Sequence, residues 1–231
     1  MNSDYQKLVS FWNDAFALNE DRIKEILGGA VEEASSLAPS IKQYEALKRL
    51  QTAEHVLDYG CGTGWASLIL AKLGAKHIVA CDVSPNAIKA LQYYAKAYQV
   101  EEAIEPVAMD TDWLGRQEAG NYDGFFSSNV IDVLPIEIAD SIIKRSARIL
   151  RPGATAIFSL NYYMDPEVLK QKGRDVRGTH VYVDDILRLN LLSDEGWLEH
   201  FAPYYDLEKL LHYAWPGEEK ETRRLYILRR K

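Results

Sequence analysis

The stretch VLDYGCGTG, residues 56–64, decides the fold expected for this chain. A short apolar run with strand character leads into Gly60, Gly62 and Gly64, and an apolar helical pattern begins directly afterwards. Glycine lets a backbone turn sharply and approach a ligand without a Cβ in the way. The first turn of the following helix offers unpaired N–H groups and the positive end of a dipole. We therefore expect this loop to bind a group such as a carboxylate, a phosphate or a ribose.

An acidic residue stands where such a loop needs a partner. Residues 77–81 have the pattern of a second strand, and Asp82 follows directly, eighteen positions after Gly64. In a doubly wound α/β fold this carboxylate lies beside the glycine loop and can accept both hydroxyls of a ribose. Asp82 also precedes Ser84 and Pro85, the N-cap and first-turn proline of a helix, so a favourable charge at a helix N-terminus is its alternative role.

Strand and helix patterns alternate along most of the chain. This alternation predicts an α/β, Rossmann-like, mostly parallel sheet with helices on both faces. Further strands are expected at residues 55–59, 104–109, 122–127 and 154–160, and a C-terminal antiparallel hairpin at 206–215 and 222–229. The basic residues of that hairpin are expected on a solvated strand edge.

The chain divides into two expected parts. Residues 1–50 form an N-terminal helical segment, and residues 51–231 form the main domain with a helical insert around 161–195, because a bare loop of that length is unusual. The apolar stripe through Phe11, Trp12 and Phe16 has two interpretations. It packs the first helix onto the rest of the fold, or it makes that segment a cap or lid over the ligand.

Composition excludes several classes of protein. The 231 residues include 34 acidic and 27 basic ones, a net charge of −7 that argues against a dedicated nucleic-acid binder. No apolar run reaches membrane-spanning length and the N-terminus does not follow the plan of a signal peptide, so we expect a cytoplasmic protein without a membrane partner. Cys61 and Cys81 are too few for a disulfide framework and have no metal-ligand spacing, so no metal site is expected.

The spacing of the glycines separates two classes of nucleotide-binding protein. Dinucleotide-binding folds use Gly-x-Gly-x-x-Gly, whereas this chain has Gly-x-Gly-x-Gly preceded by Asp58. The segment from Asp58 to Gly64 resembles the first motif of the class I S-adenosylmethionine-dependent methyltransferases, and the resemblance extends through Asp82 over about residues 55–160. It implies a seven-stranded sheet, S-adenosylmethionine as cofactor and S-adenosylhomocysteine as product.

The resemblance also implies a set of cofactor contacts. Asp58 and the backbone of Gly60 and Gly62 would bind the methionine end, Asp82 the ribose, and Asp110 the adenine amino group. Thr111 would lie beside Asp110, Val83 against the adenine, and Ser128 and Asn129 near the sulfonium. The full expected set is Asp58, Gly60, Cys61, Gly62, Gly64, Asp82, Val83, Asp110, Thr111, Ser128 and Asn129.

The acceptor is less well defined than the cofactor. The loop at 127–135 lacks the Asn/Asp-Pro-Pro-aromatic sequence typical of family members that methylate bases or glutamine side chains, so a small-molecule acceptor is expected. Tyr5, Tyr162 and His180 are candidate catalytic residues, although each is equally compatible with ordinary packing or a solvated position. Alternatives are a methyltransferase for protein or RNA, a non-catalytic cofactor-binding protein of the same fold, an aminopropyl transferase and a nucleotide-binding dehydrogenase. Monomer and homodimer both remain open.

Overall fold

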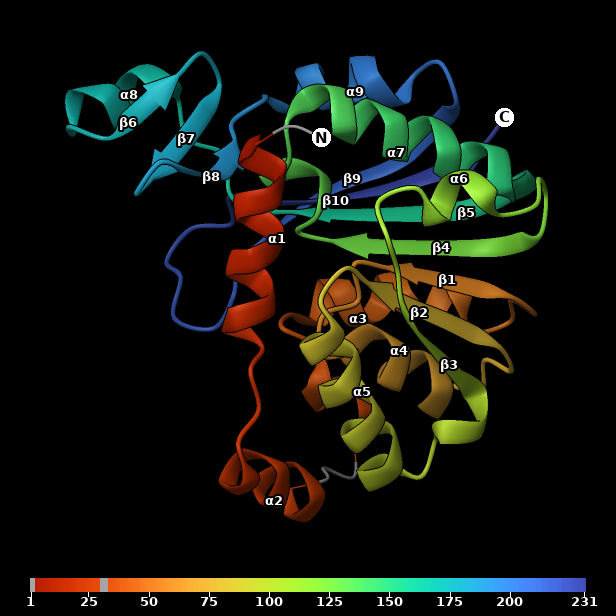
Figure 1. Cartoon of the computed structure of the whole chain (residues 1–231). Coiled ribbons are helices and arrows are strands. Elements are labelled where there is room, and N and C mark those ends of the chain that lie inside the picture. The colour runs from red at the N-terminus through yellow and green to blue at the C-terminus, as the bar shows by residue number, and fades with distance from the viewer. Residues whose placement is uncertain (1–2, 30–32) are drawn as a thin grey trace.

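A seven-stranded sheet forms the centre of the protein (Figure 1). The computed structural model describes residues 3–29 and 33–231, with side chains from residue 6 onwards. The strand order is β3-β2-β1-β4-β5-β10-β9, and β10 alone runs antiparallel to its neighbours β5 and β9 within the described sheet. The strands are β1 (Val56–Tyr59), β2 (Ile78–Asp82), β3 (Ile104–Ala108), β4 (Tyr122–Ser128), β5 (Leu150–Leu160), β9 (Tyr205–Tyr213) and β10 (Arg223–Arg230). The expected fold class is confirmed.

Helices cover both faces of this sheet. Buried residues of α3, α4 and α5 form the core on one face, and those of α6, α7 and α9 form the core on the other (Figure 1). The α-helices are α1 (Ser3–Ala15), α2 (Glu20–Gly28), α3 (Ile41–Leu47), α4 (Trp65–Lys72), α5 (Pro85–Tyr98), α6 (Trp113–Arg116), α7 (Ile136–Ile149), α8 (Pro166–Gln171) and α9 (Asp194–Phe201). Short 3₁₀ turns are η1 (Ala34–Leu37), η2 (Lys48–Leu50), η3 (Glu101–Ala103) and η4 (Ile131–Val133). In the described part of the chain, no helix is long and apolar enough to cross a membrane.

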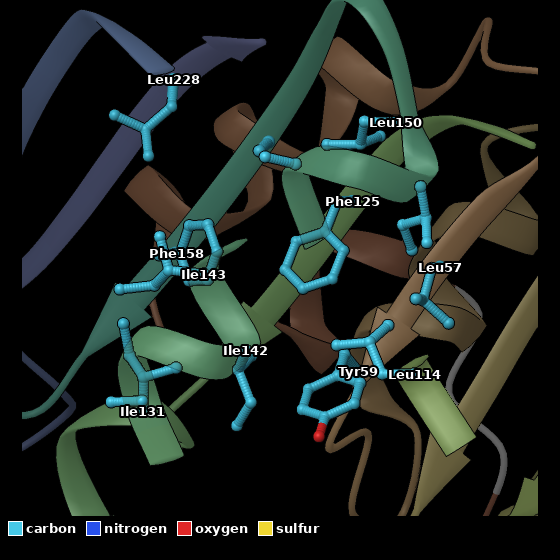
Figure 2. Packing of buried hydrophobic residues seen from close by; sticks show 14 of the residues in the cluster. Leu57, Tyr59, Leu114, Phe125, Ile131, Ile142, Ile143, Leu150, Phe158 and Leu228 are labelled. Atoms are coloured by element: carbon cyan, nitrogen blue, oxygen red, sulfur yellow. The ribbon is translucent and has the colours of Figure 1, made fainter. Parts of the chain in front are cut away.

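Aromatic side chains fill the centre of the core beneath α7. The rings of Phe125 on β4 and Phe158 on β5 lie 5.1 Å apart between centroids, and both are fully buried. Ile142 and Ile143 of α7 belong to the same buried cluster (Figure 2). Buried aromatic pairs of this kind contribute about 0.5–1.5 kcal/mol beyond the area that they bury. They fix the sheet against α7, and so fix the strand ends that carry the site.

Helix α5 begins where the sequence predicts, at Ser84 and Pro85. The Ser84 hydroxyl accepts a hydrogen bond from the Ala87 N–H at 3.1 Å, and Pro85 occupies the first turn. The predicted N-cap and first-turn proline are therefore confirmed. They place the N-terminus of α5 directly after Asp82, at the edge of the sheet where the glycine loop lies.

The segment expected to be a helical insert is mostly strand. Only α8 is helical before α9 begins, and β6 (Asp175–Arg177), β7 (His180–Val183) and β8 (Ile186–Asn190) form a separate antiparallel sheet. The turn between β7 and β8 uses Asp184 and Asp185 with φ of 52° and 58°, the left-handed conformation that suits a two-residue hairpin. Alternating apolar residues then pack against α8, and this local pairing replaces the expected helices.

The basic residues at the start of β10 are buried, which contradicts the expectation of a solvated edge. Arg223 is 5% exposed and Arg224 is 0% exposed. The reason is that β10 lies between β5 and β9 and is an internal strand. Arg224 donates hydrogen bonds to the carbonyl oxygens of Leu192 at 2.6 Å and Asn161 at 3.2 Å, so its buried charge is solvated by backbone.

Gly64 and Gly74 give a matched test of packing around the glycine loop. Both have positive φ, but a Cβ at Gly64 would lie 2.2 Å from Leu91 Cδ1, whereas a Cβ at Gly74 would meet nothing within 4 Å. We expect Gly74→Ala to cost about 1 kcal/mol for backbone strain and Gly64→Ala about 2–4 kcal/mol, because overlap with Leu91 adds to the strain. Urea unfolding of both variants measures the difference, and equal losses would contradict the packing role of Gly64.

Candidate active site

A cavity of about 320 Å³ lies at the carboxyl ends of β1, β2 and β4. Open α/β sheets bind ligands at this edge. The helix α1 crosses it, so the cavity has the sheet edge as one wall and α1 as another (Figure 1). Its lining residues are Leu8, Val9, Trp12, Phe16, Asp58, Tyr59, Gly60, Cys61, Gly62, Thr63, Trp65, Asp82, Val83, Met109, Phe126, Ser128, Asn129, Val130, Val133, Leu134 and Trp215.

The glycine loop is held in place by the end of β2. The N–H groups of Gly60 and Cys61 both donate to the carbonyl oxygen of Cys81, at 2.8 and 3.0 Å. Gly60 has φ of +69°, and a Cβ there would lie 2.3 Å from Val130 Cγ2. The loop therefore requires glycine at this position both for its backbone conformation and for its close approach to the loop after β4.

Asp82 joins the glycine loop to the N-terminus of α5. Its Oδ2 accepts from the Gly62 N–H at 2.9 Å, and its Oδ1 accepts from the Ser84 N–H at 2.8 Å. Burial raises the pKa of this carboxyl above its ordinary value. A carboxylate can accept roughly four hydrogen bonds, so these two backbone donors leave acceptor positions for the hydroxyls of a ligand. The residue fits the expected ribose contact.

Asp58 places a second carboxylate in the same cavity. Its Oδ2 accepts from both the N–H and the hydroxyl of Ser67, at 3.1 and 2.6 Å. Burial raises the pKa of Asp58 to about 7, even though these hydrogen bonds act in the opposite direction. A cationic group bound beside Asp58 would stabilise the ionised form. Asp58 therefore fits the amino group of the methionine end.

The helix α1 is anchored at the start of α5. Asn13 Oδ1 accepts from the Ser84 hydroxyl at 3.1 Å, and the Asn86 side-chain amide donates to the Asn13 carbonyl at 2.9 Å. Trp12 and Phe16 line the cavity on either side of this anchor, and Phe16 Cζ lies 3.5 Å from where a Cβ on Gly62 would be. Of the two interpretations of the N-terminal stripe, this geometry supports a covering helix.

The loop after β4 contributes a polar group. Asn129 has φ of 56°, and its N–H donates to the Ser159 carbonyl at 2.7 Å. The side-chain carbonyl oxygen of Asn129 is buried and has no hydrogen-bond partner among the described residues. Ser128 lines the cavity beside it. A buried acceptor without a partner is costly, so this position is suited to a ligand donor.

Comparisons with known proteins agree with this geometry. Residues 56–153 match the family described as "Methyltransferase domain". The chain is 26% identical over 202 residues to the ubiquinone biosynthesis O-methyltransferase of Xanthomonas campestris pv. campestris, covering 83% of this chain and 80% of that protein.

Two further proteins differ in the kind of acceptor that their names state. The ribosomal protein L11 methyltransferase of Ralstonia nicotianae is 28% identical over 151 residues, 65% of this chain and 44% of that protein. The Burkholderia thailandensis 1,6-didemethyltoxoflavin-N1-methyltransferase, solved with its acceptor and S-adenosylhomocysteine, has a TM-score of 0.68 at 14% identity, covering 100% of this chain and 91% of that one.

The family match identifies residues 56–153 as a methyltransferase domain. Together with the relatives and the fold, it supports the resemblance to the class I S-adenosylmethionine-dependent methyltransferases. The protein is a methyltransferase, and the cavity fits S-adenosylmethionine as its cofactor, because Asp58 on β1 and Asp82 at the end of β2 place two carboxylates beside the glycine loop.

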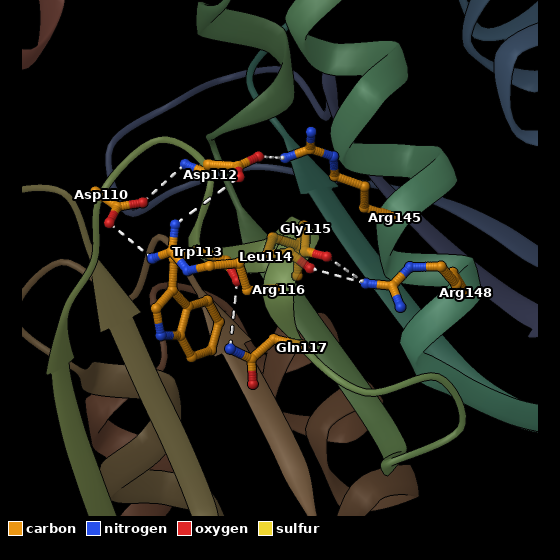
Figure 3. A network of polar contacts seen from close by, with 9 residues as sticks. All are labelled: Asp110, Asp112, Trp113, Leu114, Gly115, Arg116, Gln117, Arg145 and Arg148. Atoms are coloured by element: carbon orange, nitrogen blue, oxygen red, sulfur yellow. Dashed lines mark hydrogen bonds and ion pairs between the residues drawn. The ribbon is translucent and has the colours of Figure 1, made fainter.

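Asp110 and Thr111 of this methyltransferase do not line the cavity. Asp110 is exposed, and its carboxylate accepts from Arg116 at 2.7 Å and from the Asp112 N–H at 2.9 Å (Figure 3). The Arg116 guanidinium lowers the pKa of Asp110. Met109, one residue earlier, lines the cavity in its place. The expected adenine contact of Asp110 is therefore not supported by this arrangement.

The other expected residues fall into two groups. Gly60, Cys61, Gly62, Val83, Ser128 and Asn129 line the cavity together with Asp58 and Asp82. Gly64 does not line it and packs against Leu91 at the start of α4. Among the catalytic candidates, Tyr162 lines a second cavity, described below, whereas His180 lines neither cavity. Burial lowers the pKa of His180. Tyr5 precedes residue 6, where the description of side chains begins, so its predicted role stays a prediction.

Trp215 is a site residue that sequence reasoning missed. It lines the cavity from the hairpin between β9 and β10. The Arg223 guanidinium carbon lies 3.3 Å from the centroid of its ring, and Arg223 in turn donates to Glu218 at 2.7 Å. The Pro216-Gly217 turn predicted the hairpin. Nothing in the local sequence shows that this turn reaches the sheet edge.

The pKa of Asp58 gives a test with a definite sign. Because its folded-state pKa of about 7 exceeds the unfolded value of about 3.9, the carboxyl stabilises the fold most below about pH 4, and that contribution is lost as pH rises to about 7. Asp58→Asn removes the titrating carboxyl and keeps a side-chain oxygen that can accept hydrogen bonds from Ser67. We expect the unfolding free energy of the ligand-free wild type to fall by on the order of 4 kcal/mol more than that of the variant over this range. Urea unfolding at several pH values measures it, and parallel profiles would contradict it.

Proposed function

We propose that this methyltransferase transfers the methyl group to a small-molecule acceptor. The observation that carries the proposal is a second cavity of about 570 Å³ that adjoins the first. Trp12, Asn129, Val133 and Trp215 line both cavities. The remaining lining residues of the second cavity lie between Asn161 and Leu189, in the segment that carries α8 and the small sheet. A chamber of this size beside the cofactor site suits a small acceptor.

The protein's own contribution to the reaction is positioning and exclusion of water. When bound, S-adenosylmethionine supplies a methyl group that its sulfonium activates. Asp82 and Asp58 would hold its ribose and methionine ends. Trp12 on α1, which lines both cavities, and Phe16 just after α1, which lines the first, would exclude water from the bound cofactor. Placing two reactants in line can lower a barrier by about 7–11 kcal/mol, so this class of reaction needs few chemical groups from the enzyme.

A general base is needed only if the atom that receives the methyl group still carries a proton when it attacks. Tyr162 is the candidate that lies in the second cavity, and we propose that its hydroxyl oxygen takes the proton of the methyl acceptor while its own proton passes to solvent, to which the side chain is exposed. Asn161, next to it, is fixed from two sides, because its N–H donates to Asp132 at 2.6 Å and its side-chain oxygen accepts from Arg223 at 2.9 Å. This anchorage orients the Tyr162 backbone at the cavity wall.

The comparisons support a small acceptor without identifying it. The names of the Xanthomonas and Burkholderia proteins refer to small molecules, and that of the Ralstonia protein refers to a ribosomal protein. A macromolecular acceptor is therefore the second candidate function. With a small-molecule acceptor the transferred methyl group is found in the small-molecule fraction, and with a macromolecular acceptor it is found on protein or RNA.

The cofactor site can be tested with two matched aspartates. Asp82 and Asp123 each accept hydrogen bonds from two backbone N–H groups, at 2.8–2.9 Å, but Asp123 binds Glu54 and His55, away from the cavity. We expect Asp82→Asn to weaken S-adenosylhomocysteine binding by about tenfold to a hundredfold, since it loses charge-assisted hydrogen bonds to the ribose.

Asp123→Asn should leave the affinity within about threefold of wild type, because its carboxylate contacts no part of the site. Isothermal titration calorimetry measures both variants. Equal losses in the two would show that the effect of Asp82→Asn is on folding and would remove the residue from the site.

The class of acceptor can be tested by tracing the methyl group. We expect a bacterial extract supplied with the enzyme and methyl-labelled S-adenosylmethionine to carry the label in the small-molecule fraction after ultrafiltration, because the second cavity is walled by α8 and the small sheet. An enzyme carrying Asp82→Asn serves as the control for background labelling. Label that stays with protein or RNA would overturn the proposal, as would an absence of label above that control.

A further inference from the structure

The second cavity has an unusual charge for this chain. Its lining includes Lys172, Arg174 and Arg188, but no aspartate or glutamate, although acidic residues exceed basic ones in the sequence. Among the described residues, none of these three cations forms an ion pair. Neighbouring cations behave differently, since Arg177 pairs with Asp175 at 2.7 Å and Lys7 with Asp185 at 3.0 Å. The fold thus neutralises the cations around the cavity and leaves those in its lining without carboxylate partners.

Arg188 is held in a fixed position on β8. Its guanidinium carbon lies 4.1 Å from the ring centroid of Phe11 and 6.0 Å from that of Trp12. A guanidinium stacked on aromatic rings keeps its N–H donors at the edge free for another partner. Lys172 and Arg174 are exposed, and they lie in the turn between α8 and β6. Positive charge therefore reaches the cavity from two elements.

The rest of the lining is apolar and aromatic. Trp12, Trp215 and Tyr162 contribute rings, and Met164 and Leu169 contribute aliphatic surface. Such walls suit a flat, apolar ligand body. Aromatic walls on one part of the cavity and unpaired cations on another match a ligand that combines an aromatic body with an acidic group.

We infer that the methyl acceptor is an aromatic anion, a ring system carrying a carboxylate, sulfonate or phosphate group that Lys172, Arg174 and Arg188 bind. This inference rests on the proposed function and specifies its acceptor. The apolar wall receives the ring, and the three cations hold the acidic group on the side of α8 and β8. The acceptor atom then faces the residues that both cavities share, among which Asn129 has a buried carbonyl oxygen without a partner.

Two fluorescent probes that differ in one acidic group test the inference. 8-Anilinonaphthalene-1-sulfonate has the required ring and anion, and N-phenyl-1-naphthylamine is its neutral parent. With the enzyme saturated by S-adenosylhomocysteine, we expect the sulfonate to bind about tenfold or more tightly than the neutral probe, because charge-assisted hydrogen bonds to the cations are available to it alone. Its affinity should fall as salt is added, whereas that of the neutral probe should not.

Variants then assign the binding to the three cations. The combined substitution Lys172→Gln, Arg174→Gln and Arg188→Gln should weaken binding of the sulfonate about tenfold to a hundredfold and leave the neutral probe within about threefold. A control variant with Lys76→Gln, Lys89→Gln and Lys209→Gln removes the same charge from exposed positions outside the cavity and should bind both probes as the wild type does. Arg188→Lys in the wild-type background keeps the charge and should lose less than Arg188→Gln.

Separate measurements distinguish failure of this inference from failure of the proposed function. Calorimetry with S-adenosylhomocysteine reports whether the triple variant still folds and binds its cofactor, and the methyl-labelling experiment reports the acceptor class independently. Equal binding of the two probes would overturn the inference that the methyl acceptor is an aromatic anion. So would an equal loss of affinity for the sulfonate in the triple and control variants. Either result would do so even if small molecules carry the label.

Discussion

The buried carboxylate of Asp82 is the contact on which the site depends. It accepts from the Gly62 N–H on one side and the Ser84 N–H on the other, so it ties the loop after β1 to the N-terminus of α5. The same N-terminus holds Asn13 through Ser84 and Asn86, and this fixes α1 over the strand ends. A buried charge needs such hydrogen bonds to be tolerated. One carboxylate thus positions the glycine loop directly and, through the N-terminus of α5, the helix α1 that covers the cofactor cavity.

The two adjoining cavities are lined by ionisable side chains of opposite kind. Asp58 and Asp82 lie in the first, and Lys172, Arg174 and Arg188 lie in the second. S-adenosylmethionine carries positive charge on its sulfonium and amino group, so an acidic chamber complements it. A basic chamber next to it complements an anionic acceptor, and like-charged ligands would be disfavoured in the wrong chamber. The separation would orient donor and acceptor before any contact is made at the reacting atoms.

Sequence reasoning predicted the parts of this structure that local chemistry determines. The strand ends, the glycine loop and the Ser84 N-cap follow from side-chain period, backbone freedom and capping, each of which acts over a few residues. Two misses have a different physical origin. The Asp184–Asp185 turn closes a local hairpin without the glycine that usually marks such a turn. The burial of Arg223 depends on the pairing of β10 with β5, which is distant in the sequence and which propensity does not encode. Likewise Trp215 joins the site because β10 of the C-terminal hairpin pairs with β5, a contact between segments far apart in the sequence.

Trp12 belongs to the wall of both cavities, and this shared wall links their occupancy. A ligand that shifts α1 or restricts the Trp12 ring in one chamber changes the surface offered to the ligand in the other, and by reciprocity the effect runs both ways. Donor and acceptor are therefore expected to bind cooperatively rather than independently. The salt bridge from Lys7 on α1 to Asp185 in the small sheet extends this coupling to the segment that encloses the acceptor.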